Sequence, residues 1–151
     1  MSTLKSRLQS DLTAAIRSRD EVVSSTLRLT LTAITTEEVA GKTARELSDD
    51  EVLKVIVREA KKRREAAEAF AAGGRAESAE RERAEGVVLA AYLPAQLSDD
   101  ELKAIVADAI AATGASGPQA MGQVMKVVRP KVGDRAEGGR IAAEIKSRLG
   151  A

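Results

Sequence analysis

The chain has 151 residues, and its 24 basic and 23 acidic side chains leave a net charge of +1. This length is enough for one good hydrophobic core or two small ones. The small net charge excludes a polycation that binds nucleic acid through its overall charge balance. The chain has no cysteine and no histidine, so it lacks thiolate chemistry, disulfides, the commonest general base and the commonest zinc ligand.

The sequence shows no apolar targeting or membrane segment and very few aromatic residues, which limits where the protein is expected and how it could bind nucleic acid. The N-terminal stretch "MSTLKSRLQSDL" lacks the apolar centre of a signal peptide, and no apolar run approaches the ~20 residues that cross a bilayer. We therefore expect a cytoplasmic protein with no membrane partner. The only aromatic residues are Phe70 and Tyr92, which excludes a surface that stacks several nucleic-acid bases on rings.

Hydrophobic spacing predicts two helices in the first 40 residues. Leu4, Leu8 and Leu12 recur every four residues, which is typical of a helix, and this helix should end near Arg19. The next stretch, "VVSSTLRLTLTAITTEEV", is rich in β-branched residues and partly alternates as a strand does. Helical spacing fits it as well, and no neighbouring segment offers a strand to pair with. We predict a helix.

The motif "LSDDE" occurs twice, at residues 47–51 and 97–101. If Ser48 and Ser98 are N-caps, Glu51 and Glu101 stand where a capping box needs its acidic partner, and the leucine before each serine can close a hydrophobic staple. The aspartates then fall in a first helical turn, where the helix dipole favours negative charge. A Mg²⁺ or Ca²⁺ site is the alternative for so many carboxylates. We favour helix starts, because they explain every residue type without an ion.

The longest helical pattern follows the first motif. It runs from Val52 to Phe70, and we call it the spine helix; glycines 73 and 74 should end it. A fourth helix should close before Pro94, because the residue before a proline leaves helical geometry. Tyr92 is expected to anchor the packing between the two parts of the chain. These patterns predict an N-terminal four-helix domain over residues 1–94.

Three more helices are predicted in residues 95–151. The first follows the second "LSDDE" motif and should end at Gly114. The second should start with Ser116 as its cap and Gln119 as capping-box partner, and Pro130 should end it. Isoleucines 141 and 145 and Leu149 mark the last one. The whole chain is therefore predicted to be all-α, with a small three-helix C-terminal domain.

Several stretches resemble the YqeY-like proteins, namely "LSDDEVLKVIVREAKKRREAAEAF", "AAYLPAQLSDDELKAIV", "MGQVMKVVRPKV" and "RAEGGRIAAEIKSRL". The resemblance covers essentially the whole chain. It implies two all-α domains related to the C-terminal tail of the B subunit of the tRNA-dependent amidotransferase, which converts Glu-tRNA(Gln) or Asp-tRNA(Asn) to the amide. In that enzyme the tail contacts tRNA and the ligase chemistry lies in a separate body. Asp134 departs from the family, which often has glycine there.

Two groups of basic residues are candidate binding sites. The first group, which we call the spine run, lies within two turns of the spine helix and comprises Arg58, Lys61, Lys62, Arg63 and Arg64. Glutamates are interleaved with these cations, so the run is either a solvated helix face with ion pairs or a site that binds phosphate or a partner. The tail cluster lies around the junction of the last two helices, in a segment (residues 113–151) with seven basic and three acidic side chains; it comprises Lys126, Arg129, Lys131, Arg135 and Arg140. A helix start beside these cations could seat an RNA backbone; the alternative is a solubilising surface.

Three functional hypotheses remain at this point. The first is a non-catalytic accessory protein that contacts tRNA, or the tRNA-handling amidotransferase machinery, through its basic C-terminal part. The second is an enzyme, a carbon–nitrogen ligase with glutamine as amido-nitrogen donor, as the family relationship would suggest. The third is a protein–protein scaffold that uses the spine helix. No catalytic residue, cofactor or metal site is predicted, because the chain has no phosphate loop of the "GxxxxGK[ST]" kind and no other catalytic motif.

Overall fold

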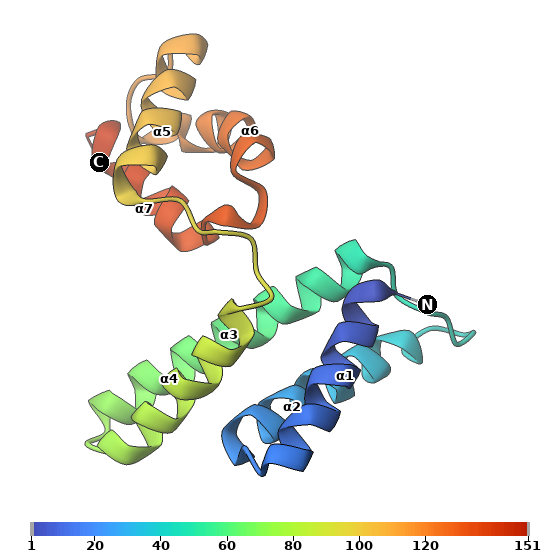
Figure 1. Cartoon of the computed structure of the whole chain (residues 1–151). Coiled ribbons are helices and arrows are strands. Elements are labelled where there is room, and N and C mark those ends of the chain that lie inside the picture. The colour runs from blue at the N-terminus through green and yellow to red at the C-terminus, as the bar shows by residue number, and fades with distance from the viewer. Residues whose placement is uncertain (1, 151) are drawn as a thin grey trace. The chain divides into compact units, whose positions relative to one another are not determined.

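The computed structural model describes residues 2–150, and within them it contains seven α-helices, two short 3₁₀ helices and no strand (Figure 1). The prediction of an all-α protein is confirmed. The helices are α1 (Thr3–Ser18), α2 (Glu21–Glu38), α3 (Asp49–Ala72), α4 (Ala76–Ala90), α5 (Asp99–Thr113), α6 (Met121–Val132) and α7 (Gly138–Arg148), and the 3₁₀ helices are η1 (Pro118–Ala120) and η2 (Gly133–Arg135).

The chain divides into two compact units, and the division falls between Leu93 and Pro94. Unit 1 holds α1 to α4 and unit 2 holds α5 to α7. Each unit has its own cluster of buried apolar side chains. That each unit is an independent domain stays a prediction.

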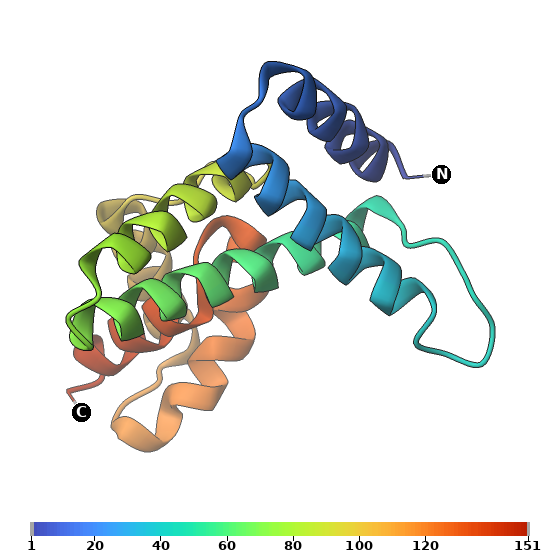
Figure 2. The same ribbon diagram turned by 90° about the horizontal axis from the view of Figure 1, so that it is seen from below.

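Unit 1 consists of two helical hairpins, α1–α2 and α3–α4, which can be followed in Figures 1 and 2. Its core combines residues from all four helices, among them Leu8, Leu27, Ile56 and Leu89, each almost completely buried. Tyr92 packs against this core and its hydroxyl donates a hydrogen bond to Asp11 on α1. These contacts of Tyr92 lie within unit 1, whereas the sequence led us to expect an anchor between the two parts.

The segment with mixed strand and helix signals is helical along its whole length, as α2. Its buried threonine hydroxyls donate to the carbonyl four residues earlier, Thr26 to Val22 at 2.7 Å and Thr30 to Thr26 at 2.9 Å. These bonds satisfy polar atoms that burial would otherwise leave unpaired. The packed face that contains Leu27 and Ile34 therefore outweighs the low helix propensity of the threonines.

Unit 2 packs three helices around one core that includes Val106, Val128 and Ile145. Two boundary predictions are wrong here. Ser116 caps no helix; Gly117 precedes η1 instead, and its φ of 80° lies in the left-handed region that glycine adopts without strain. Pro130 does not end α6, which continues to Val132.

The end of α6 falls at a glycine rather than at the proline. Gly133 has a φ of 57°, again in the left-handed region, and follows the last helical residue. Pro130 stands in the last turn of α6, where its missing N–H removes one backbone bond, and the helix still continues for two residues. Asp134 has no positive φ, because Arg19 is the one non-glycine residue with that geometry among residues 2–150. The departure from the family pattern at Asp134 therefore does not strain this turn.

Both "LSDDE" motifs start helices, as predicted. At α3 the capping box is complete: the Ser48 hydroxyl accepts from the Glu51 N–H at 3.2 Å, and the Glu51 carboxylate accepts from the Ser48 N–H at 2.8 Å. At α5 the box is partial. The Ser98 hydroxyl accepts from the Glu101 N–H at 3.1 Å, but it donates to the Glu101 carboxylate, which does not reach the backbone.

The caps predict a measurable cost in stability. Replacing Ser48 or Ser98 by alanine leaves a helix-start N–H without its acceptor, and we expect each change to lower the free energy of unfolding by about 0.5–2 kcal/mol in urea titrations. Ser147→Ala is the matched control, because this serine is exposed within α7 and caps nothing. A loss for the capping variants no larger than for the control would contradict the assignment.

Candidate nucleic-acid interface

The spine run on α3 is a network of ion pairs. Lys61 pairs with Glu65 at 3.8 Å and Lys62 pairs with Glu59 at 3.0 Å, both on the same helix. Arg58 reaches across to Glu37 on α2, and Arg64 has a partner as well. Exposed pairs of this kind add little stability, but they neutralise the face on which they lie. The run therefore has the arrangement expected of a solvated helix face.

Arg63, the remaining member of the spine run, is a structural residue. Its guanidinium lies 3.3 Å from both Glu82 and Glu85 on α4, and Arg81 reaches Glu85 from the other side at 3.4 Å. The Glu85 side chain is only 8% exposed. A buried carboxylate needs such partners, and removing one of them leaves an uncompensated charge. Arg63 thus holds α3 to α4 and is unavailable to a phosphate.

Two members of the tail cluster are also structural. Arg135 donates to the carbonyls of Lys131, at 2.6 Å, and Val132, at 3.3 Å, which closes the C-terminal end of α6. Arg140, in the first turn of α7, donates to the Leu97 carbonyl and to the Asp99 carboxylate, each at 3.0 Å. These bonds tie the segment before α5 to α7. Arg135 and Arg140 organise the C-terminal unit; Arg140 pairs with the Asp99 carboxylate, and Arg135 bonds to backbone carbonyls and keeps its charge.

The other three cations of the cluster are exposed and without an ion-pair or hydrogen-bond partner among residues 2–150; they are Lys126, Arg129 and Lys131. All three lie on α6. At about 100° per residue, Lys126 and Arg129 project about 60° apart, whereas Lys131 lies on the opposite flank of the helix. Lys126 and Arg129 therefore form one contact surface, and Lys131 adds positive charge on the other flank of α6.

Arg129 links this surface to the start of α7. Its terminal guanidinium nitrogen lies so close to Gly138 that a β-carbon at that position would be 3.4 Å away. Gly138 is the first residue of α7, which has no side-chain cap. The backbone N–H groups of a first turn lack partners within the helix and favour a negative charge. The exposed cations of α6 and the start of α7 are thus neighbours through Arg129.

Unit 2 contains no aromatic residue, because Phe70 and Tyr92 both belong to unit 1. Base stacking on rings is therefore impossible at the tail cluster. Lysine and arginine side chains on a helix contact phosphates and set the position of a nucleic acid, but such contacts carry no sequence information. The surface can bind a nucleic-acid backbone by charge and shape.

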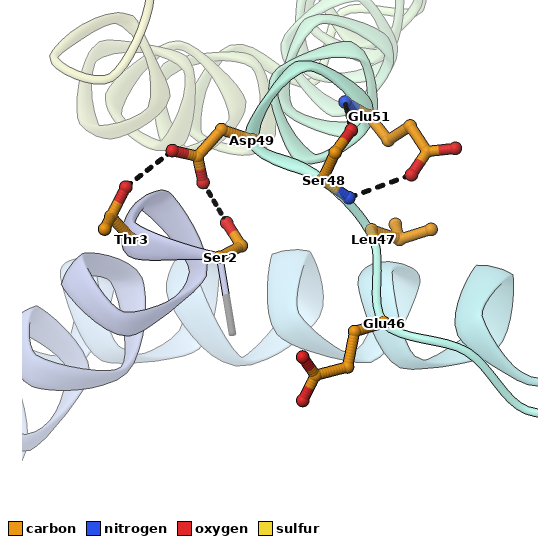
Figure 3. Close-up of a pocket in the computed structure, with 7 residues that line it drawn as sticks. All are labelled: Ser2, Thr3, Glu46, Leu47, Ser48, Asp49 and Glu51. Carbon is orange, nitrogen blue, oxygen red and sulfur yellow. Dashed lines mark hydrogen bonds between the residues drawn. The ribbon is translucent and has the colours of Figure 1, made fainter.

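The acidic motif at the start of α3 lines an open cavity of about 470 Å³ (Figure 3). Its carboxylates are used as caps. Asp49 accepts hydrogen bonds from the hydroxyls of Ser2 and Thr3 and from the backbone N–H of Leu4 at 3.0 Å, so it caps α1 from the neighbouring helix. Glu51 is held by Ser48 and by Arg45, whose nitrogens lie 2.9 and 3.0 Å from its carboxylate.

These bonds favour the charged forms of both carboxylates. The hydroxyls of Ser2 and Thr3 and the Leu4 N–H lower the pKa of Asp49 to about 2, and Arg45 and the Ser48 N–H lower the pKa of Glu51 to about 2. Within residues 2–150 no group of three or more acidic side chains is arranged to hold a metal ion. The motif serves as a pair of helix caps.

Sequence reasoning missed the cap that Asp49 gives to α1 and the bonds of Arg140 to the segment before α5. Both join residues more than 40 positions apart. For the contact of Asp49 with α1, a signal in the sequence was Ser2. This serine precedes α1, and the first turn of α1 has no acidic residue that could complete a capping box with it. For the second, no local pattern in the sequence points to Leu97 or Asp99.

A sequence profile of the Yqey-like proteins matches residues 5–149, and the chain belongs to this family. No curated protein sequence matches the chain. Over the described part of the chain, no helix has the length and apolar character needed to cross a membrane.

The lowered pKa of Asp49 predicts a pH dependence of stability. A carboxyl whose folded pKa lies below its unfolded value of about 3.9 contributes stability above that value and loses it as the pH falls through the folded pKa. The melting temperature of the wild type should therefore fall between about pH 5 and pH 2. Asp49→Asn should make this fall shallower.

Asp50→Asn is the matched control for this experiment, because Asp50 is exposed and has no bonding partner among the described residues. It should leave the pH profile close to that of the wild type. Equal pH profiles for the Asp49 and Asp50 variants would contradict the role of Asp49 as the cap of α1.

Proposed function

We propose that this Yqey-like protein is a non-catalytic accessory protein that binds the backbone of tRNA through the exposed cations of α6 in unit 2. The observation that carries the proposal is the contrast between the two basic groups. The spine run is neutralised by glutamates, whereas Lys126, Arg129 and Lys131 have no such partners among residues 2–150. When a free cation binds a phosphate, it releases a counterion from the nucleic acid, which favours binding. A cation that is already paired with a carboxylate must first break that ion pair.

The resemblance to the amidotransferase tail supports the choice of tRNA as partner. In that enzyme the tail contacts tRNA while a separate catalytic body carries out the ligase chemistry. We accordingly place the protein with the tRNA-handling machinery, including tRNA-dependent amidotransferase, in the cytoplasm. Its role there is to hold RNA or to bring it to an enzyme.

Binding of this kind has a characteristic salt dependence. With about three phosphates neutralised, the logarithm of the association constant should fall with the logarithm of salt concentration with a slope of about −2 to −3. Sequence changes in the RNA should matter little, because contacts to phosphate do not distinguish bases.

Charge reversal tests the site. Changing Lys126, Arg129 and Lys131 to glutamate shifts the net charge of residues 113–151 from +4 to −2. We expect tRNA affinity, measured by fluorescence anisotropy at low salt, to fall by at least about 100-fold, because attraction to phosphate becomes repulsion. The fold should persist, since all three side chains are exposed.

The matched control is a triple reversal on α3, using Arg58, Lys61 and Lys62, whose side chains are 59, 55 and 64% exposed. Arg63 is left intact because the loss of its ion pairs with Glu82 and Glu85 would destabilise unit 1. This variant should retain most of the affinity. If it loses tRNA binding while the α6 variant keeps it and remains helical, the placement of the site is wrong; if neither changes, the RNA hypothesis fails.

The rival enzymatic hypothesis has its own test. We expect the purified chain, given glutamine and misacylated Glu-tRNA(Gln), to release no glutamate above the buffer rate, because it lacks histidine, the commonest general base, and cysteine, and because no motif marks a serine–lysine pair in their place. Release that survives repeated purification and scales with protein concentration would establish the ligase or amidase reading instead.

A further inference from the structure

The outer side of the α1–α2 hairpin carries a groove that the proposed function does not use. Its volume is about 480 Å³, and it is lined by Leu12 of α1 and by a stripe that runs from Arg28 of α2 to Val39, the residue that follows this helix. Leu12 and Leu31 are half-buried, and Val39 is 58% exposed. Ile16, one turn beyond Leu12 on α1, is also exposed. Exposed apolar side chains that gather beside a groove are typical of a contact site.

The groove is almost free of charge. Eight consecutive residues of α2, from Leu29 to Thr36, are uncharged in a chain in which 31% of residues are charged. Arg28 is the one charged residue of the lining, and it has no ion-pair partner among residues 2–150. A single cation cannot follow a phosphate chain, so the groove suits a protein helix with apolar side chains and one carboxylate at its end.

This chain presents a helix of that description on α4. The face of α4 opposite its buried residues exposes Glu80, Ala84, Val87 and Ala91, which are spaced four, three and four residues apart and so form one stripe. Val87 is 73% exposed, the largest value among the exposed large apolar side chains of the described residues. The stripe begins with a carboxylate and continues with small and apolar groups.

The two surfaces match in register. Arg28 and Val39, the residue that follows α2, are eleven positions apart, and so are Glu80 and Ala91, the residue that follows α4. Laid parallel, the helices place Glu80 opposite Arg28 and Val87 opposite Thr35, while the alanines allow close approach. The Glu80 carboxylate pairs with Arg83 at an exposed site, and such a pair is weak enough to be exchanged for Arg28.

We propose that the groove between α1 and α2 binds α4 of a second copy of this chain. The α4 of the same copy cannot fill it, because its opposite face is buried against α2 and α3 through Ala79, Glu85 and Leu89. The contact is heterologous, since different surfaces meet. If two copies each bind the α4 helix of the other, the two contacts form a closed two-fold dimer. If each copy binds the α4 helix of the next one only, the contacts extend into longer assemblies.

The association is weak. A helix of three turns in one groove buries less than the roughly 800 Å² per partner that stable complexes need. Self-association should therefore become visible at micromolar to millimolar protein concentrations. The inference does not depend on RNA binding, because all its residues lie in unit 1 and the tail cluster lies in unit 2.

Sedimentation velocity on the full chain tests the contact. We expect the weight-average mass to rise above that of the monomer as concentration increases. Arg28→Glu alone and Glu80→Arg alone should each weaken association about tenfold or more, because each brings like charges together. The double variant should recover most of the loss. Val87→Lys should also weaken association, because it places a charge against Leu12 and Leu31.

Lys54→Glu is the matched control for charge, since Lys54 is exposed on α3 and has no bonding partner in the described part of the chain. It should associate as the wild type does, and circular dichroism should show equal helix content for all variants. A wild type that stays monomeric up to millimolar concentration overturns the proposal. So does self-association that Arg28→Glu and Val87→Lys leave unchanged, or a double variant that recovers nothing.

Discussion

Unit 1 depends on a junction of carboxylates where three helices begin or end. Asp49, the first residue of α3, caps α1, and Glu51 completes the cap of α3 itself. Glu38, at the end of α2, accepts from Lys5 of α1 at 2.8 Å and from the Leu47 N–H at 3.2 Å. Lys5 and the Leu47 N–H lower the pKa of Glu38, so it too is held in its charged form. The junction fixes how the α1–α2 hairpin meets α3, and with it the groove beside α2.

The pairing of acidic with basic side chains also explains where we expect the protein to bind a polyanion. Most of the acidic partners in the described structure serve helix starts or hold helices together, as Glu85 does between α3 and α4. In residues 113–151 the acidic residues are few, three against seven basic ones. Of the tail cluster, Arg135 donates to backbone carbonyls, and Arg140 donates to the Leu97 carbonyl and the Asp99 carboxylate. Within the tail cluster, the side chains without such bonds in the described part of the chain are the three cations of α6. We propose that these cations, rather than the larger basic run of α3, are the part that meets RNA.

Much of this fold could be predicted from the sequence because its signals are local. The caps at Ser48 and Ser98 follow from residue types within one turn, and the all-α class follows from hydrophobic spacing. The errors also have local causes. Pro130 removes one backbone bond near the end of α6 without ending the helix, and the residue before η1 is Gly117 rather than Ser116.

The candidate site was less predictable, because it depends on contacts between distant residues. Composition showed that residues 113–151 are basic, but not which cations are free. Only the fold shows that Arg140 is engaged by Leu97 and Asp99. Only the fold shows, too, that Arg63 is held by α4 while Lys61 and Lys62 are paired along their own helix. The distinction between an ion pair and a free charge is three-dimensional, and it decides the proposal.

The most direct test of the central claim is an NMR titration of the ¹⁵N-labelled chain with tRNA. Our account predicts that amide shifts will change along α6 and at the start of α7, around Lys126, Arg129 and Gly138, and that they will revert as salt is added. Shift changes that map to α3 around Lys61 and Lys62 and leave α6 unchanged, or no change at any RNA concentration in low salt, would contradict it.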